Sequence, residues 1–113
     1  MLKVTFEEKD GKLTLQLEGH AGQAEIGQDI ICASCSILAY TVAQLVTTAE
    51  GMGNLKTDPE IKLEVGEGII SCEPTEKAYG AVKRAYYFAE VGYTLLSQNF
   101  PQFVEVKRFG KDI

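Results

Sequence analysis

The sequence lacks three features that would point to a membrane, a nucleic acid or export. No run approaches about 18 unbroken apolar residues, so we expect no membrane-spanning segment. Lys and Arg number 11 against 16 Asp and Glu, and the net charge of -5 argues against a surface that grips phosphate backbones. Residues 1–8 contain no long apolar stretch behind a basic start, so we expect no signal peptide and a cytoplasmic location.

Cysteine and histidine are scarce, with three cysteines and one histidine. An odd number of cysteines without an export signal is typical of thiols in a reducing cytoplasm. A structural zinc site needs about four Cys or His ligands, which this chain could supply only by recruiting the distant Cys72. Neither GxxxxGK[ST] nor GxGxxG is present. The sequence therefore predicts no metal site and no nucleotide cofactor.

The composition is that of an ordinary globular protein. The 113 residues are 45% hydrophobic and 24% charged, which is enough to bury a core without covalent staples. We expect a single domain over residues 1–113.

Hydrophobic alternation predicts five strands. Residues 8–11 predict a hairpin turn between the first two strands, and residues 66–68 predict another between the third and fourth. The five segments with period-two alternation are residues 2–6, 13–18, 60–65, 69–73 and 103–109.

Two segments have helical spacing. The first helix should end at Gly51 and Gly53, and the second should run from a cap at Thr75 to residues 98–99. The first predicted apolar face is Ile31, Cys35, Leu38, Val42, Leu45, Val46 and Ala49, beside a small-residue stripe of Cys32, Ser36, Ala39 and Ala43. The second is Ala78, Val82, Ala85, Ala89, Gly92 and Leu96, with Tyr86, Phe88 and Leu95 beside it.

The element order β-β-α-β-β-α-β predicts the fold class. We expect an α+β two-layer sandwich, in which a largely antiparallel five-stranded sheet carries both helices on one face.

Residues 19–36 hold the only histidine and two of the three cysteines. His20 follows the second predicted strand, and a glycine-bearing loop then leads to Asp29, a plausible N-cap. Cys32 would thus lie in the first helical turn, where unpaired backbone N–H groups favour a thiolate. A thiolate with a nearby imidazole is the chemistry of a cysteine nucleophile and its base.

Other interpretations of the same residues stay open. Cysteine is usually a small buried hydrophobe, and we expect this of Cys72 and Cys35. Cys32 and Cys35 also form a CxxC pair, typical of a dithiol redox centre, although a hairpin precedes it rather than a βαβ unit. The tyrosines at 79, 86, 87 and 93 fit a core or an interface better than base stacking.

The stretch resembles the ribosomal-processing cysteine protease family. The resemblance rests on Gly19-His20-Ala21, on Gly27-Gln28-Asp29-Ile30-Ile31-Cys32-Ala33, and on Ser36. It implies that Cys32 is the nucleophile and His20 the base, with supporting positions at Gly19, Gly27, Asp29 and Ser36. Cys35 departs from the family pattern, which more often has an aliphatic residue there.

The resemblance also implies a substrate and an assembly. Family members are bacterial cytoplasmic endopeptidases, generally homodimeric and without a cofactor, that remove a short N-terminal extension from a large-subunit ribosomal protein. Two other functions remain possible: a thiol-disulfide oxidoreductase using Cys32 and Cys35, and a ribosome-associated binding protein without enzymatic activity.

Overall fold

The structure is a computed structural model that describes residues 1–19 and 30–110. Its elements follow the predicted order. They are β1 (Leu2–Lys9), β2 (Lys12–Gly19), α1 (Ile30–Gly51), β3 (Glu60–Glu64), β4 (Glu67–Cys72), α2 (Tyr79–Asn99) and β5 (Val104–Phe109).

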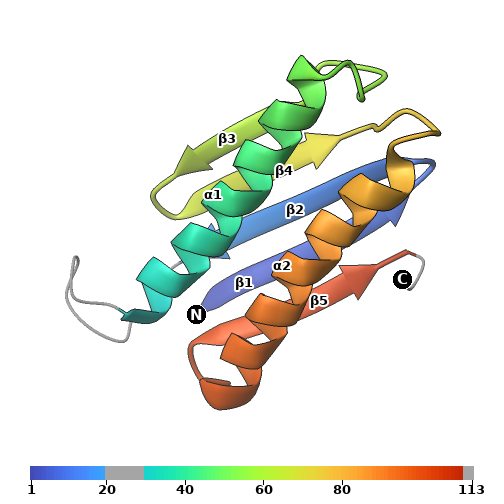
Figure 1. Cartoon of the computed structure of the whole chain (residues 1–113). Coiled ribbons are helices and arrows are strands. Elements are labelled where there is room, and N and C mark those ends of the chain that lie inside the picture. Colours follow the sequence, from blue (N-terminus) through green and yellow to red (C-terminus); the bar gives the residue numbers. More distant parts are fainter. Residues whose placement is uncertain (20–29, 111–113) are drawn as a thin grey trace.

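The five strands form one sheet in the order β3-β4-β2-β1-β5. Three neighbouring pairs are antiparallel, and only β1 and β5 are parallel. Both helices cover the same face of the sheet and run in opposite directions (Figure 1). The predicted fold class is therefore confirmed.

The β1–β2 hairpin shows how the strand pattern produces the core. Its turn is formed by Asp10 (φ 52°) and Gly11 (φ 79°), the positive φ pair that a two-residue hairpin requires. Alternate residues of β1 face the helices and are buried, including Val4 and Phe6. The residues between them face away from the helices, so this sheet has one packed face and one open face.

The buried faces of the two helices differ in part from the predicted ones. In α1, Leu45 is 47% exposed, whereas Ala39 and Ala43 of the predicted small-residue stripe are buried. In α2, Phe88 is 70% exposed and Tyr93 is fully buried. Helix α2 also begins at Tyr79, and the Thr75 hydroxyl accepts a hydrogen bond from the Ala78 N–H one turn earlier.

Helix α1 is, among the described residues, the one helix long and apolar enough to cross a membrane by length and composition. A core helix of a folded protein passes the same test. The buried face of α1 packs against the sheet and α2, and its residues belong to the hydrophobic core. Its opposite face is exposed, at Ile37 and Tyr40 for example.

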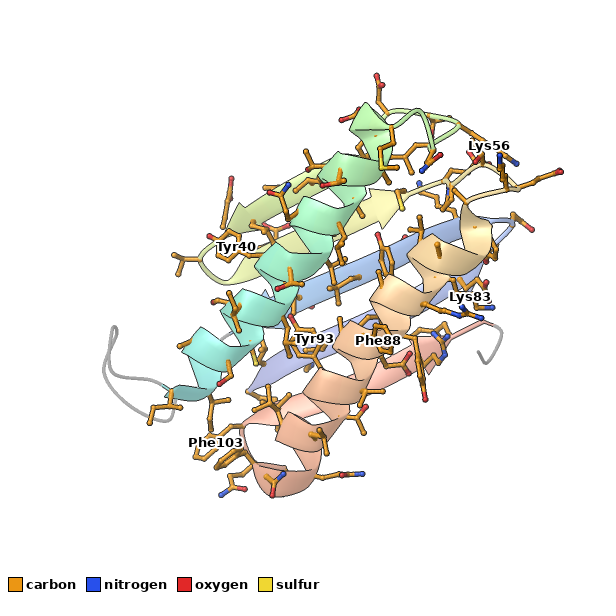
Figure 2. All side chains as sticks on the ribbon, viewed as in Figure 1. Tyr40, Lys56, Lys83, Phe88, Tyr93 and Phe103 are labelled. Carbon is orange, nitrogen blue, oxygen red and sulfur yellow. The ribbon has the colours of Figure 1, made fainter. Side chains whose placement is uncertain are left out.

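Polar contacts fasten α2 to the sheet. The Lys83 ammonium lies 2.9 Å from a Glu8 carboxylate oxygen, and Arg108 lies 3.3 Å from Glu90. The Tyr86 hydroxyl donates to the Ile70 carbonyl at 3.0 Å. Figure 2 labels Lys83 and Tyr93 along α2; Lys83 reaches Glu8 of β1, and the Tyr93 ring centroid lies 6.0 Å from that of Phe6 on β1. These contacts fix which face of α2 points outward.

Candidate active site

The structure describes three of the six predicted site residues. Gly19, Cys32 and Ser36 are described, whereas His20, Gly27 and Asp29 lie outside the described residues. The end of β2 and the first turn of α1 lie at the same end of the sandwich (Figure 1). The chain therefore brings Gly19, the residue before His20, to the end that carries Cys32.

Gly19 occupies a position that only glycine fits. Its φ is +93°, and a Cβ built on it would lie 2.5 Å from the Met1 carbonyl oxygen. Its N–H donates to the Gly66 carbonyl at 2.9 Å. A side chain at position 19 would push the end of β2 away from its neighbours. This gives a physical reason for a glycine directly before His20.

Cys32 is the third residue of α1 and is half-buried. Its side chain packs at the border of the core cluster rather than inside it. The first helical turn leaves backbone N–H groups without intrahelical partners, so Cys32 lies beside donors that can bind an anionic oxygen. Ser36 is exposed one turn further along the helix.

Cys35 lies on the core side of the same helix. It is 4% exposed, and the Tyr93 hydroxyl donates to its carbonyl oxygen at 2.7 Å. Burial is the main reason that the pKa of Tyr93 is raised far above its ordinary value, and nearby Cys35 adds to it. The buried hydroxyl therefore stays protonated and holds the second turn of α1 against α2. No sequence signal identified this contact, because it depends on how the two helices align.

Cys72 lies far from the first turn of α1, within β4. It is 2% exposed and its Sγ lies 3.6 Å from the Tyr86 hydroxyl. Burial raises the pKa of the Cys72 thiol, partly offset by the hydrogen bond with Tyr86. The predictions that Cys35 and Cys72 are core residues are confirmed.

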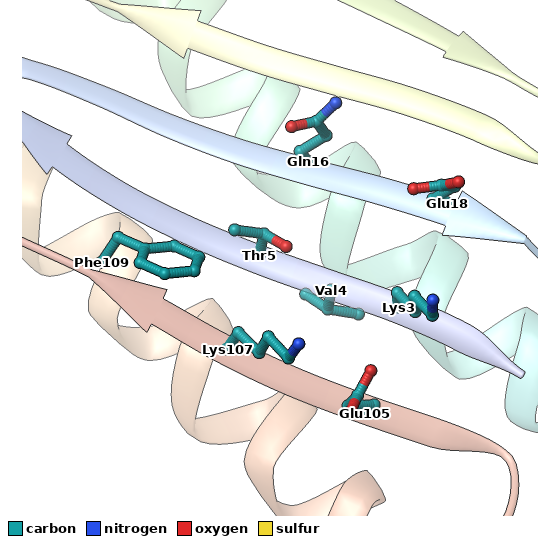
Figure 3. Close-up of a pocket in the computed structure, with 8 residues that line it drawn as sticks. All are labelled: Lys3, Val4, Thr5, Gln16, Glu18, Glu105, Lys107 and Phe109. Atoms are coloured by element: carbon teal, nitrogen blue, oxygen red, sulfur yellow. The ribbon is translucent and has the colours of Figure 1, made fainter.

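The structure offers no competing metal centre in its described parts. Across residues 1–19 and 30–110, no three His, Cys, Asp or Glu side chains are grouped to hold a metal ion. A shallow hollow of about 250 Å³ lies on the open face of the sheet, away from the helices (Figure 3). Its lining residues are Lys3, Val4, Thr5, Gln16, Glu18, Glu105, Lys107 and Phe109, and they do not include Cys32.

Comparison with known proteins identifies related structures. SMU.848 from Streptococcus mutans is 30% identical, with a TM-score of 0.66 over 98% of this chain and 96% of that chain. The essential ribosomal processing protease Prp from S. aureus, solved with a covalently linked product peptide, is 18% identical. Its TM-score is 0.71 over 96% of this chain and 99% of that chain.

A second structure of the S. aureus protease, with a substrate peptide, is 17% identical, with a TM-score of 0.66 over 96% of this chain and 99% of that chain. No curated protein matches the sequence significantly. The model of the cysteine protease Prp family, however, matches residues 1–105. With this match over nearly the whole sequence, the chain belongs to the Prp family of cysteine proteases and is a cysteine-type peptidase.

Proposed function

We propose that this protein is a cytoplasmic endopeptidase that removes a short N-terminal extension from a bacterial large-subunit ribosomal protein. The observation that carries the proposal is the position of Cys32 in the first turn of α1, at the end of the sandwich where β2 leads to His20. The S. aureus ribosomal processing protease of the same fold has been solved with a substrate peptide and with a covalently linked product peptide. One domain, residues 1–113, would carry the whole activity.

In the proposed reaction, His20 takes the proton of the Cys32 thiol, the resulting thiolate attacks the scissile carbonyl carbon, and the carbonyl oxygen becomes an oxyanion. Backbone N–H groups of the first turn of α1 hold that oxyanion. The carbon–nitrogen bond then breaks, and His20 gives a proton to the leaving amine. Water hydrolyses the resulting thioester, which releases the second product and the thiol. No cofactor or metal takes part.

The remaining site residues act on the geometry of this turn. Asp29 would cap α1 and so fix the direction of the N–H groups beside Cys32. Gly19 lets the end of β2 lie close to the Met1 carbonyl, and Gly27 would fill a supporting position, as the family resemblance implies. Ser36, one turn beyond Cys32, would position the substrate or the turn itself.

The substrate would bind as an extended segment. An N-terminal tail adds main-chain hydrogen bonds along a sheet edge, and the family resemblance implies hydrophobic or aromatic residues before the cut. The net charge of -5 attracts a basic ribosomal protein.

The burial of Cys35 argues against the dithiol alternative. A redox CxxC centre needs a second thiol that can close the disulfide and release a mixed disulfide. Cys35 is only 4% exposed, and its helix is held there by the hydrogen bond from Tyr93. A position in the core fits a hydrophobic role better.

The experiment is mass spectrometry of an extended ribosomal-protein peptide after incubation with wild type and three variants. Cys32→Ala and His20→Ala should abolish cleavage, whereas Cys35→Val should retain it, because valine fills the same core space. Loss of activity in Cys35→Val, with a reversible Cys32–Cys35 disulfide, would favour the oxidoreductase. Binding by every protein without any cut would favour a ribosome-associated binding protein.

A further inference from the structure

Two of the three thiols in this chain lie one helical turn apart at the start of α1. Cys32 is the third residue of the helix and Cys35 is the sixth, so their spacing is i to i+3. In an α-helix this spacing puts the two Cα atoms about 5 Å apart. A disulfide bond needs Cα atoms roughly 4.4–6.8 Å apart, so the helix backbone already meets this condition.

The two side chains lie on the same side of α1. Cys35 is 4% exposed and belongs to the core, and half-buried Cys32 packs against the same core cluster. Helical Cβ atoms at i and i+3 are about 5–6 Å apart, which is roughly 1–2 Å more than in a disulfide. A tighter 3₁₀ turn brings the side chains at i and i+3 into line, and such turns are common at helix N-termini. A small local change of this turn therefore joins the two sulfur atoms.

The surroundings give the two thiols different parts to play. Cys35 is held in place, because the Tyr93 hydroxyl of α2 donates to its carbonyl oxygen at 2.7 Å. Cys32 borders the core, and its neighbours Ala33 and Ser36 are small and exposed. A small oxidant from solvent can thus reach Cys32, whereas Cys35 can react only with what lies beside it.

Cys72 cannot replace Cys35 in such a pair. It lies opposite Leu13 in the sheet, and Leu13 is six residues before Gly19 along β2. At about 3.3 Å for each residue, Cys72 lies about 20 Å from the end of the sheet where α1 begins. The thiol of Cys72 is also only 2% exposed.

From this arrangement we infer that Cys35 is the resolving thiol of a peroxide-sensitive switch, in which it closes a reversible disulfide with oxidised Cys32. First, the Cys32 thiolate attacks one oxygen of hydrogen peroxide, the oxygen–oxygen bond breaks, and the leaving hydroxide takes a proton to become water. The product is a sulfenic acid. The Cys35 sulfur then attacks the Cys32 sulfur, the sulfur–oxygen bond breaks, and hydroxide leaves with the Cys35 proton as a second water. The two thiols lose two electrons, and the peroxide gains them.

The disulfide stops cleavage, because Cys32 can no longer attack a carbonyl carbon. A dithiol reductant reverses the switch by attacking the half-buried Cys32 sulfur, which releases the Cys35 thiol. Without a resolving thiol, further peroxide turns the sulfenic acid into a sulfinic acid, which dithiols do not reduce. The loss of cleavage rests on the proposed function of Cys32, whereas formation of the disulfide does not.

This switch differs from the oxidoreductase activity considered above. An oxidoreductase exchanges disulfides with other proteins, and the burial of Cys35 disfavours that exchange. Attack on a sulfur one turn away in the same helix needs no exposure of Cys35. In a reducing compartment the pair stays as two thiols, so the peptidase is active until peroxide appears.

The test is treatment of the reduced protein with hydrogen peroxide, followed by alkylation of the remaining thiols, digestion and mass spectrometry. Wild type should give a fragment with Cys32 joined to Cys35, and dithiothreitol should restore at least about nine-tenths of peptide cleavage. In Cys35→Val, Cys32 should become a sulfinic acid, and dithiothreitol should restore less than about a tenth. The matched control is Cys72→Ala, which removes the other buried thiol and should behave as wild type does.

Cys35→Ala provides a second variant without the resolving thiol. Circular dichroism establishes that each variant is folded, and either folded variant suffices. Sulfinic acid on Cys32 of wild type with Cys35 still a thiol would overturn the inference. So would recovery of a folded Cys35 variant to the wild-type level, or loss of the disulfide in Cys72→Ala. If wild type never cleaves the peptide, the proposed function fails, but the fragment masses still decide whether the disulfide forms.

Discussion

Glu8 is the acidic residue whose burial requires a partner. Its side chain is 5% exposed and that of Lys83 is 18% exposed, so little water screens the pair. Lys62 offers a contrast, because its contacts with Glu64 and Glu67 at 3.9 and 3.7 Å lie at the surface, and its side chain is 46% exposed. The two lysines therefore differ in surroundings and not in charge.

Lys83→Gln should destabilise the protein by about 2–3 kcal/mol, because it leaves a buried carboxylate without its cation. Lys62→Gln, the matched surface change, should stay within about 0.5 kcal/mol of wild type. Urea unfolding of the three proteins measures both values. Equal losses of unfolding free energy in Lys83→Gln and Lys62→Gln would contradict a stabilising role for the Glu8–Lys83 pair.

At the scale of elements, the contact between the two helices depends on one glycine. A Cβ added at Gly92 would lie 2.9 Å from both methyl carbons of Leu38 on α1, whereas one at Gly80 would meet nothing within 4 Å. Both glycines lie in α2. Alanine substitutions at these two positions therefore separate the effect of helix propensity from the effect of packing.

Gly80→Ala should stabilise the protein by about 0.5–1 kcal/mol through helix propensity. Gly92→Ala should give no such gain, because its methyl group must displace Leu38. In a Leu38→Ala background, Gly92→Ala should recover the gain, which thermal unfolding of the double-mutant set would measure. Additive effects of Leu38→Ala and Gly92→Ala would contradict this description of the helix contact.

Element type and order were predictable from the sequence, because strand alternation and helical spacing are local patterns. The predicted strand at 13–18, for example, lies within β2. The predicted turn at residues 8–11 contains the observed turn at Asp10 and Gly11, although Glu8 and Lys9 belong to β1. Which face of α1 is buried was less predictable. Apolar residues surround this helix, so spacing alone did not separate exposed Leu45 from buried Val46.

The strand order and the site geometry depend on contacts that are distant in sequence. The parallel pairing of β1 with β5 joins the two ends of the chain, and no local pattern encodes it. Cys32 could be assigned to the first turn of a helix, and the structure confirms this position.

For the molecule as a whole, three buried groups that stay protonated in the folded state lower the free energy of unfolding at alkaline pH. Burial raises the pKa values of Cys72, Tyr86 and Tyr93. In the unfolded chain these groups would lose protons near 9.0 for cysteine and 10.0 for tyrosine. Above those values the folded state binds more protons than the unfolded state, so the free energy of unfolding falls as pH rises.

Each of these groups should contribute a slope of about 1.4 kcal/mol per pH unit once its unfolded form is deprotonated. The contribution is fully present below pH 9 and is lost as pH rises. Tyr93→Phe should reduce the slope by about that amount above pH 10. Urea unfolding at a series of alkaline pH values measures the slopes. An identical slope in Tyr93→Phe and wild type would contradict the assignment.

In the proposed reaction, Cys32 forms the covalent intermediate. The most direct measurement is rapid acid quenching of the enzyme with an extended ribosomal-protein peptide, followed by digestion and mass spectrometry of the cysteine-containing fragments. The N-terminal part of the peptide should be attached to Cys32 through a thioester, with Cys35 and Cys72 unmodified. An acyl group on another residue, or cleavage that continues in Cys32→Ala, would contradict it.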